Sequence, residues 1–427
     1  MKTSRVVITG MAINTPIGDT LDTFLENLLQ GKSAITQWKS IKKDKIYGKV
    51  GGDLGGYDID SKIESYRDQI PEAIFKRLSK LSARFPKLMS ISMQTAVEVF
   101  LNAGLIHDLD QFDNIATVIS GHNLNQGYTF SNHELFNEDP DFIEGLFALK
   151  GLDTNYVGII SEVLQLKGAG YTVGGACASG NMALRCAVNE VRFNEMPVAA
   201  VIAPVLDYSP LDIQGMAVMG AISYQNFNER PTEASRPYDT GREGFIPAHG
   251  AAALIVEDLE HALERGAHIY AEVLGVESST DGSHLPKPSR EGQARLMRRL
   301  LKKCNVLPEE VDYINAHATS TPLGDITEIN SIKDVFGENA YQLKINAPKS
   351  MLGHCCWSAA TVEMVAGVLQ MNAGELHPSI NIETLDPEVD IDVCANRRTS
   401  HDINIMMKNS FGFGGINSVG LIKRYGV

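Results

Sequence analysis

The stretch "GGACASGNMAL", residues 174–184, places one cysteine between a pair of glycines and the start of a helix-like run. Glycines suit a tight strand-to-helix turn, because they allow the backbone to bend sharply. A thiol at a helix N-terminus faces free N–H groups and the positive end of the helix dipole, and both favour the reactive thiolate. A small buried cysteine in a packing site fits the same residues. This stretch alone leaves open whether Cys177 is a nucleophile or a packing residue.

The chain around Cys177 alternates short apolar runs with helix-like runs, which favours an α/β fold with a largely parallel sheet. The first set of expected strands lies at the start of 5–18, at 114–121, at 169–179, at 198–207 and at the start of 250–267. The pattern then begins again with a strand at 268–282, an amphipathic helix at 289–306, and strands within 311–325, 343–354 and 403–425. The chain is therefore predicted to form two similar halves, residues 1–267 and 268–427, which share one core.

Composition narrows the class of protein. The net charge of −14 argues against broad binding to nucleic acid or to an anionic membrane. The sequence has no apolar run long enough to span a membrane and no signal-peptide pattern at its start, so a cytoplasmic location is expected. The six cysteines show no zinc-type spacing, which favours a reduced protein without a metal site. The densest basic cluster, within residues 76–87, is either a solvated helix face or a docking surface for an acidic partner.

Three further motifs carry polar groups. His317 opens the hydroxyl-rich loop "NAHATSTPLGD", and Lys349 and His354 lie in "PKSMLGHCCWSAATVE". In "NSFGFGGINS", Phe411 and Phe413 alternate with glycines. Taken singly, these motifs are explained by a loop hydrogen bond, a capped helix with an exposed lysine, and an ordinary hairpin.

Together and in this order, these motifs resemble those of the β-ketoacyl-acyl-carrier-protein synthase family, the condensing enzymes of the thiolase superfamily. The resemblance runs from "VVITGMAINTPIG" through "ASRPYDTGREGF" (234–245) to the last strand. It implies a thiolase-like, duplicated five-layer α-β-α-β-α fold and a homodimer. It also implies malonyl and acyl thioesters as substrates, delivered on the phosphopantetheine arm of an acyl carrier protein. No metal or redox cofactor is implied.

The resemblance also assigns roles to single residues. Cys177 matches the nucleophile of the family's Cys-x-Ser-Gly turn, and His317 matches the first catalytic histidine. Thr319 and Thr321 complete that histidine's motif, His-[Gly/Ala]-Thr-x-Thr, and are expected to contact substrate. Phe413 matches an aromatic gate whose N–H is expected to share an oxyanion hole with the N–H of Cys177.

The remaining matches concern the second histidine. Lys349 and His354 match the motif Lys-Ser-x-x-Gly-His. Glu328 matches the acidic residue expected to pair with Lys349, and it is also expected among the substrate-binding residues. The implied reaction is a decarboxylative Claisen condensation, in which two imidazoles hold the enolate oxygen. Lys349 and Glu328 are expected to set the electrostatics and orientation of the site from one layer further out.

Some residues depart from the family pattern, and other functions stay open. His249 stands where the family has an acidic residue, and Trp357 interrupts a run of small residues after His354. These departures favour a specialised pathway such as polyketide assembly over housekeeping fatty acid elongation. One alternative is a malonyl-carrier-protein decarboxylase that supplies acetyl units, and another is a non-catalytic partner subunit of a ketosynthase heterodimer. Both usually lack the cysteine that this chain keeps. A thiolase would need a second catalytic cysteine, which "NSFGFGG" lacks.

Overall fold

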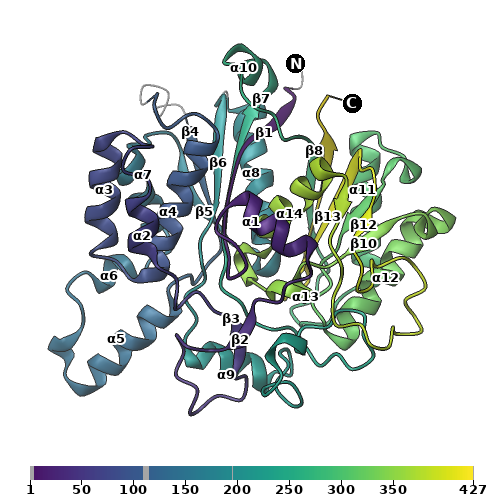
Figure 1. Cartoon of the computed structure of the whole chain (residues 1–427), viewed down its shortest axis with the longest axis horizontal. Helices are drawn as coiled ribbons and strands as arrows, with labels where there is room; N and C mark the ends of the chain where they lie inside the picture. The colour runs from purple at the N-terminus through teal and green to yellow at the C-terminus, as the bar shows by residue number, and fades with distance from the viewer. Residues whose placement is uncertain (1–3, 109–114, 195, 427) are drawn as a thin grey trace.

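The fold is seen in a computed structural model that describes residues 4–108, 115–194 and 196–426 (Figure 1). Its main sheet has ten strands in the order β10-β9-β13-β14-β8-β1-β7-β6-β4-β5. One half of the sheet contains β1 (Val6–Asn14), β4 (Ile115–Ser120), β5 (Gly170–Val173), β6 (Val198–Ala203) and β7 (Ala251–Asp258). The other half contains β8 (Ala271–Thr280), β9 (Tyr313–Asn315), β10 (Lys344–Asn346), β13 (Ile405–Gly412) and β14 (Ile416–Arg424).

The two halves repeat one topology. In the first half β7 is antiparallel to β1 and β6, while β4 is parallel to β6 and β5. In the second half β14 is antiparallel to β8 and β13, while β9 is parallel to β13 and β10. The halves join where Val6–Ile8 of β1 pair with Ala271–Val273 of β8. This duplicated pattern agrees with the thiolase-like α/β architecture expected from the sequence.

The sheet is mixed, so the expectation of a largely parallel sheet was wrong. Within the ten-stranded sheet, five of the nine strand pairings among the described residues are antiparallel. The clearest reason is the hairpin between β13 and β14, because a turn of three residues, 413–415, joins only antiparallel neighbours. β6 and β7 are almost entirely buried, and such uninterrupted apolar strands gave no sign of their direction.

Helices form three layers around the two half-sheets, which gives the five-layer arrangement visible in Figure 1. α8 (Ser179–Phe193) and α14 (Ala359–Ala373) lie in the middle, where their apolar side chains share one core with both halves. α3 (Glu72–Ser82), α4 (Lys87–Asn102) and α7 (Asn155–Leu164) cover the outer face of the first half. α11 (Arg290–Cys304) and α12 (Pro322–Phe336) cover the outer face of the second half.

Shorter elements connect these layers. Near the N-terminus they are α1 (Leu21–Leu29), β2 (Ile35–Gln37), β3 (Val50–Gly52) and α2 (Ile59–Glu64). Between β4 and β8 they are α5 (Gln126–Glu138), α6 (Phe147–Lys150), α9 (Pro210–Val218) and α10 (Leu259–Glu264). In the second half they are α13 (Lys349–Leu352), β11 (Glu375–Leu376) and β12 (Thr399–Ser400). Within the described ranges, no helix is both long and apolar enough to span a bilayer.

Candidate active site

Cys177 lies in a one-turn 3-10 helix, Ala176–Ala178, that links β5 to α8. Ala176 has a φ of +47°, a left-handed conformation that a residue with a side chain seldom adopts. Gly175 precedes it at a point where a Cβ atom would come within 2.3 Å of the Met182 sulfur. The turn is therefore sharp and closely packed, and such strained turns occur often at functional sites.

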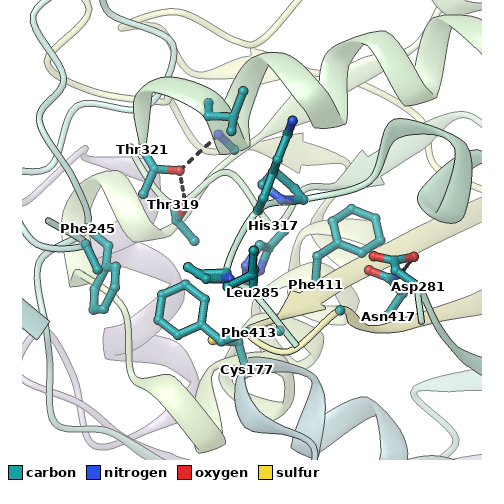
Figure 2. Close-up of a pocket in the computed structure, with 18 of the residues that line it drawn as sticks. Cys177, Phe245, Asp281, Leu285, His317, Thr319, Thr321, Phe411, Phe413 and Asn417 are labelled. Carbon is teal, nitrogen blue, oxygen red and sulfur yellow. Dashed lines mark hydrogen bonds between the residues drawn. The ribbon is translucent and has the colours of Figure 1, made fainter. Parts of the chain in front are cut away.

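Two backbone amides face the thiol. The main-chain N–H groups of Phe413 and of Cys177 itself both donate toward the sulfur. Phe413 reaches it because Gly412 lets the end of β13 approach the turn: a Cβ atom there would lie 2.9 Å from the Gly175 oxygen. Figure 2 shows Phe413 beside Cys177, with His317 above them. Fixed amides in this position have the geometry of an oxyanion hole.

The second half of the chain supplies two histidines to the same point. One donor atom each from Cys177, His317 and His354 lies within 4.8 Å of the others. The two imidazole centroids are 5.6 Å apart, and the rings meet edge to face. Three residues from distant parts of the sequence thus form a single cluster, as the sequence predicted.

The hydrogen bonds of His354 fix its tautomer. Its Nδ1 accepts the main-chain N–H of Cys356 at 3.2 Å, so a neutral ring carries its proton on Nε2. Nε2 of His354 and Nδ1 of His317 are buried and have no hydrogen-bond partner within the described ranges. Burial lowers the pKa of both imidazoles well below the usual value, and the nearby ammonium groups of Lys349 and Lys408 lower it further. Both rings are therefore neutral at physiological pH.

The thiol itself differs from the sequence-based expectation of a stabilised thiolate. Burial raises the pKa of Cys177 to about 11, although Lys349 and the two amides favour the charged form. Desolvation outweighs the helix N-terminus because Cys177 is 6% exposed and α8 begins only at Ser179. The resting group is a neutral thiol, and its proton has to leave during the attack.

Lys349 supports His317 from behind. Its Nζ donates to the main-chain oxygen of His317 at 2.6 Å and forms a buried ion pair with Glu363. The expected pairing of Lys349 with Glu328 was wrong, because Glu363 on α14 lies closer to the ammonium group. A second buried lysine, Lys408, lies 2.7 Å from the other carboxylate oxygen of Glu363.

Glu328 does not line the substrate cavity either, so its assignment to substrate binding is not supported by its position. One of its oxygens accepts the main-chain N–H of His317 at 2.9 Å, and the other accepts that of Ala318 at 2.8 Å. Asn409 donates a further hydrogen bond to it at 2.9 Å. Glu328 thus fixes the backbone that carries His317.

A cavity of about 430 Å³ opens onto the cysteine and both histidines. Thr319, Thr321 and Phe413 also line it, as the sequence analysis expected of substrate-contacting residues. The Thr319 and Thr321 hydroxyls are hydrogen-bonded to each other at 3.0 Å, and Thr321 also caps α12 (Figure 2). Two hydroxyls and a largely apolar wall suit the amide-bearing arm of a thioester.

A second cavity, of about 400 Å³, meets the first at Cys177. Phe245 and Phe413 belong to the walls of both cavities, whereas neither histidine lines the second one. Its other lining residues include Leu206, Tyr208, Met216, Cys356 and Trp357. The thiol therefore lies between a cavity lined by both imidazoles and a mostly apolar cavity without them.

Comparisons with known proteins agree with this geometry. Residues 3–262 match the model of the β-ketoacyl synthase N-terminal domain, and residues 270–383 match that of the C-terminal domain. The chain belongs to the β-ketoacyl synthase family. It is therefore an enzyme, an acyltransferase of the condensing class.

Individual relatives of this β-ketoacyl synthase come from two kinds of pathway. It is 34% identical to 3-oxoacyl-[acyl-carrier-protein] synthase I, chloroplastic, of Arabidopsis thaliana, over 97% of this chain and 85% of the relative. It is 31% identical to the polyketide biosynthesis malonyl-ACP decarboxylase PksF of Bacillus subtilis, over 97% of this chain and 95% of that relative. A type II polyketide ketosynthase, solved with its acyl-carrier protein, superimposes with a TM-score of 0.86 at 27% identity, covering 99% of this chain and 100% of that one.

The two departures from the family pattern occupy different places in this synthase. His249 is buried between Trp38 and Tyr208, and its Nδ1 lies 3.4 Å from a carboxylate oxygen of Asp53. It lines neither cavity and holds the loop after β3. Trp357 lines the second cavity and stacks on His122, with ring centroids 4.5 Å apart. Only Trp357 is placed to affect the substrate.

Proposed function

We propose that this chain catalyses the decarboxylative condensation of a malonyl thioester with an acyl chain carried on Cys177, in fatty acid or polyketide synthesis. The observation that carries the proposal is the meeting of one thiol, two neutral imidazoles and two amide donors where two cavities join. A thiol alone would suit many acyl transfers. Two hydrogen-bond donors beside it suit a reaction in which a second oxyanion, an enolate, forms.

In the first half-reaction the sulfur attacks the acyl thioester. The amides of Cys177 and Phe413 stabilise the oxyanion that forms, an effect worth several kcal/mol in a dry site. The thiol proton passes to the departing pantetheine sulfur, which leaves as a thiol, so that both imidazoles keep the protons that they donate in the second half-reaction. Cys177 then holds the acyl group as a thioester.

In the second half-reaction a malonyl thioester enters the cavity with the histidines. Its carboxylate leaves as CO₂, and the electron pair of the broken carbon–carbon bond moves into an enolate. Nε2–H of His354 and the ring of His317 donate hydrogen bonds to the enolate oxygen. The enolate carbon then attacks the acyl carbonyl on Cys177, the carbon–sulfur bond breaks, and the released thiolate takes up one proton from solvent to restore the resting thiol.

The two cavities divide the substrates between them. The first holds the malonyl group and its pantetheine arm, contacted by Thr319 and Thr321. The second holds the acyl chain, because its wall is mostly apolar and it reaches the sulfur away from the imidazoles. The polyketide-pathway relative and the bulky Trp357 support a specialised pathway with a restricted acyl range.

Both substrates arrive on an acyl carrier protein, in line with the solved ketosynthase complex. In the basic cluster at 76–87, Lys76 pairs with Glu72 and Arg77 donates to the Val163 carbonyl oxygen, whereas Lys80 and Arg84 are exposed. We expect Lys80→Glu with Arg84→Glu to weaken binding of the acidic carrier protein, measured by titration. An unchanged affinity would assign the cluster to a solvated helix face.

The enzyme is further proposed to act as a homodimer. β5 ends the ten-stranded sheet, and within the described ranges no strand pairs with its outer edge. Large apolar side chains are exposed along α5 and the segment after it, namely Leu135, Phe136, Phe142, Ile143, Leu146, Leu149 and Leu152. An open strand edge and a run of exposed apolar side chains are each typical of an interface. A cytoplasmic location and chemistry without a cofactor stay predictions.

The test is to incubate the purified protein with malonyl-carrier protein, with and without an acyl donor, and to follow all products by mass. Condensation gives β-ketoacyl-carrier protein only when the donor is present. Cys177→Ala should abolish condensation and leave some decarboxylation, because His317 and His354 remain. Loss of both activities in this variant would contradict the separate roles of the thiol and the imidazoles.

The same experiment decides between the alternatives. A malonyl-carrier-protein decarboxylase, the activity named for the Bacillus subtilis relative, would give acetyl-carrier protein whether or not a donor is present. A non-catalytic partner subunit would give neither product. The geometry favours condensation, because Cys177 lies in reach of both imidazoles and a decarboxylase has no use for the thiol.

A further inference from the structure

Lys408 is a fully buried charge for which the mechanism above has no role. It is the single charged residue of β13, "IMMKNSFG", and is 0% exposed. Its Nζ donates to Ser410 Oγ at 3.2 Å and lies 2.7 Å from Oε2 of Glu363. Oε1 of the same carboxylate holds Lys349. One buried carboxylate thus carries two ammonium groups.

Behind His317 and His354 lie four buried charges, two lysines and two glutamates. Lys349 comes from α13, Lys408 from β13, Glu363 from α14 and Glu328 from α12. Their charges balance, which makes their shared burial tolerable, since isolated buried charges are very costly. After burial, Lys349 is the group that lowers the pKa of each imidazole most, and Lys408 lowers both as well, while His354 also lowers that of His317. The Cys177 thiol is a further titratable group close to the rings.

We infer that Lys408 is a positioning residue of the condensation, which keeps both imidazoles as neutral hydrogen-bond donors while the malonyl carboxylate is bound. It does so in two ways. Through Glu363 it holds Lys349 against the His317 carbonyl, and as a second cation behind the rings it opposes their protonation. The inference rests on the proposed function, since it concerns the decarboxylation step.

The malonyl carboxylate makes this control necessary. A negative charge beside an imidazole favours the imidazolium. An imidazolium would stabilise the carboxylate that has to leave as CO₂. It would also give its proton to the enolate carbon, forming an acetyl thioester and a neutral imidazole. The enolate would then be lost before it attacked the acyl group on Cys177. A fixed positive charge behind the rings disfavours that route.

The test measures the ratio of acetyl-carrier protein to β-ketoacyl-carrier protein between about pH 6 and pH 8, the range over which imidazoles titrate. In the wild type the ratio should stay flat. In Lys408→Met the cation is gone, so the imidazole pKa rises and the acetyl product should increase as the pH falls. Once protonation limits the outcome, the increase approaches about tenfold per pH unit.

Three variants serve as controls. Lys408→Arg keeps the charge and should keep the flat ratio. Lys150→Met removes another buried lysine, paired with Glu144 outside the site, and should leave the ratio unchanged. The double variant Lys408→Met with Glu363→Gln restores the charge balance, and the new amide oxygen can still accept a hydrogen bond from Lys349, so the ratio should also stay flat. If Lys408→Met is too unstable to assay, the double variant still exposes the inference to refutation, because a ratio that rises as the pH falls would contradict it.

The outcomes separate the inference from the proposed function. If the wild type makes neither product, the proposed function fails. If the wild type condenses and the ratio in Lys408→Met stays as flat as in the wild type, Lys408 has no role in the chemistry and the inference is overturned. A ratio that rises with falling pH in the double variant would also overturn it.

Discussion

Cys177 and Trp357 occupy the same place in two copies of one turn. Each is the middle residue of a 3-10 helix, Ala176–Ala178 in the first half and Cys356–Ser358 in the second. The residues before them, Ala176 and Cys356, have φ angles of +47° and +48°. Each turn leads into a helix of 15 residues, α8 or α14. The duplication thus places a cysteine in the first half and a tryptophan in the second half, and both line the second cavity.

Trp357→Gly is expected to widen the range of acyl chains that Cys177 accepts. The indole lines the second cavity and is fixed by its stack on His122 and by a hydrogen bond from Ser120 to its main-chain oxygen. Removing the indole opens space in the second cavity, where the acyl chain is proposed to lie. Acylation of Cys177 by long-chain thioesters should rise about tenfold or more, equivalent to about 1.4 kcal/mol. Intact-mass spectrometry with donors of increasing length measures this directly.

Trp357→Phe is the matched control, because it keeps an aromatic ring against His122. It should change the chain-length profile little. Thermal melting of both variants shows whether the larger deletion costs stability, since emptying a core position is destabilising. A wild type that takes long chains as readily as short ones would contradict the role given to Trp357.

Alkylation of Cys177 should depend steeply on pH. Burial raises its pKa to about 11, so the thiolate is a small fraction at neutral pH and grows about tenfold with each pH unit. The rate of iodoacetamide labelling, followed by peptide mass, should therefore still be rising at pH 9. Lys349→Met removes a nearby cation and should slow labelling at any given pH. A plateau below pH 9 would show that the resting group is a thiolate.

The catalytic groups could be predicted from the sequence, but their supporting charges could not. Cys177, His317 and His354 stand in short motifs with a fixed order. The partners of Lys349 depend on which helix packs behind it, and that is a property of the tertiary structure. A signal did exist: Glu363 is the single charged residue of α14, and Lys408 that of β13. A charged side chain in an apolar segment is rarely buried unless it is paired, so each of these two residues indicated a buried ion pair.

The fold, like the site, could be predicted from the sequence only in part. The restart of the strand pattern near residue 268 was visible because β7 and β8 are long and apolar. The strand directions were not visible, because β6 and β7 are buried on both faces and carry no alternation. The thiol pKa was misjudged for a different reason. A helix N-terminus can be recognised in a sequence, whereas the depth of burial that outweighs it depends on the packed structure.

Chelators should leave condensation unchanged, and added zinc should slow it. The proposed steps use no metal, so dialysis against EDTA is expected to remove no activity. Yet Cys177, His317 and His354 supply one sulfur and two nitrogen donors within 4.8 Å of one another, and zinc prefers such ligands. Zinc should therefore compete with acylation of the thiol. Activity that is lost on dialysis and restored by a metal would contradict the assigned chemistry.

Thr172→Pro should convert the proposed dimer into a monomer. The main-chain oxygens of Ala169 and Val173 accept hydrogen bonds from the β4 side, at Thr117 and Gly121. Backbone groups alternate in direction along a strand, so the N–H of Thr172 points to the open edge. Proline removes that donor and leaves the β4 ladder intact. Light scattering should then report 46.5 kDa for the variant and twice that mass for the wild type. Thr172→Val, which keeps the N–H, should stay dimeric, and a dimeric proline variant would show that the two copies do not join through β5.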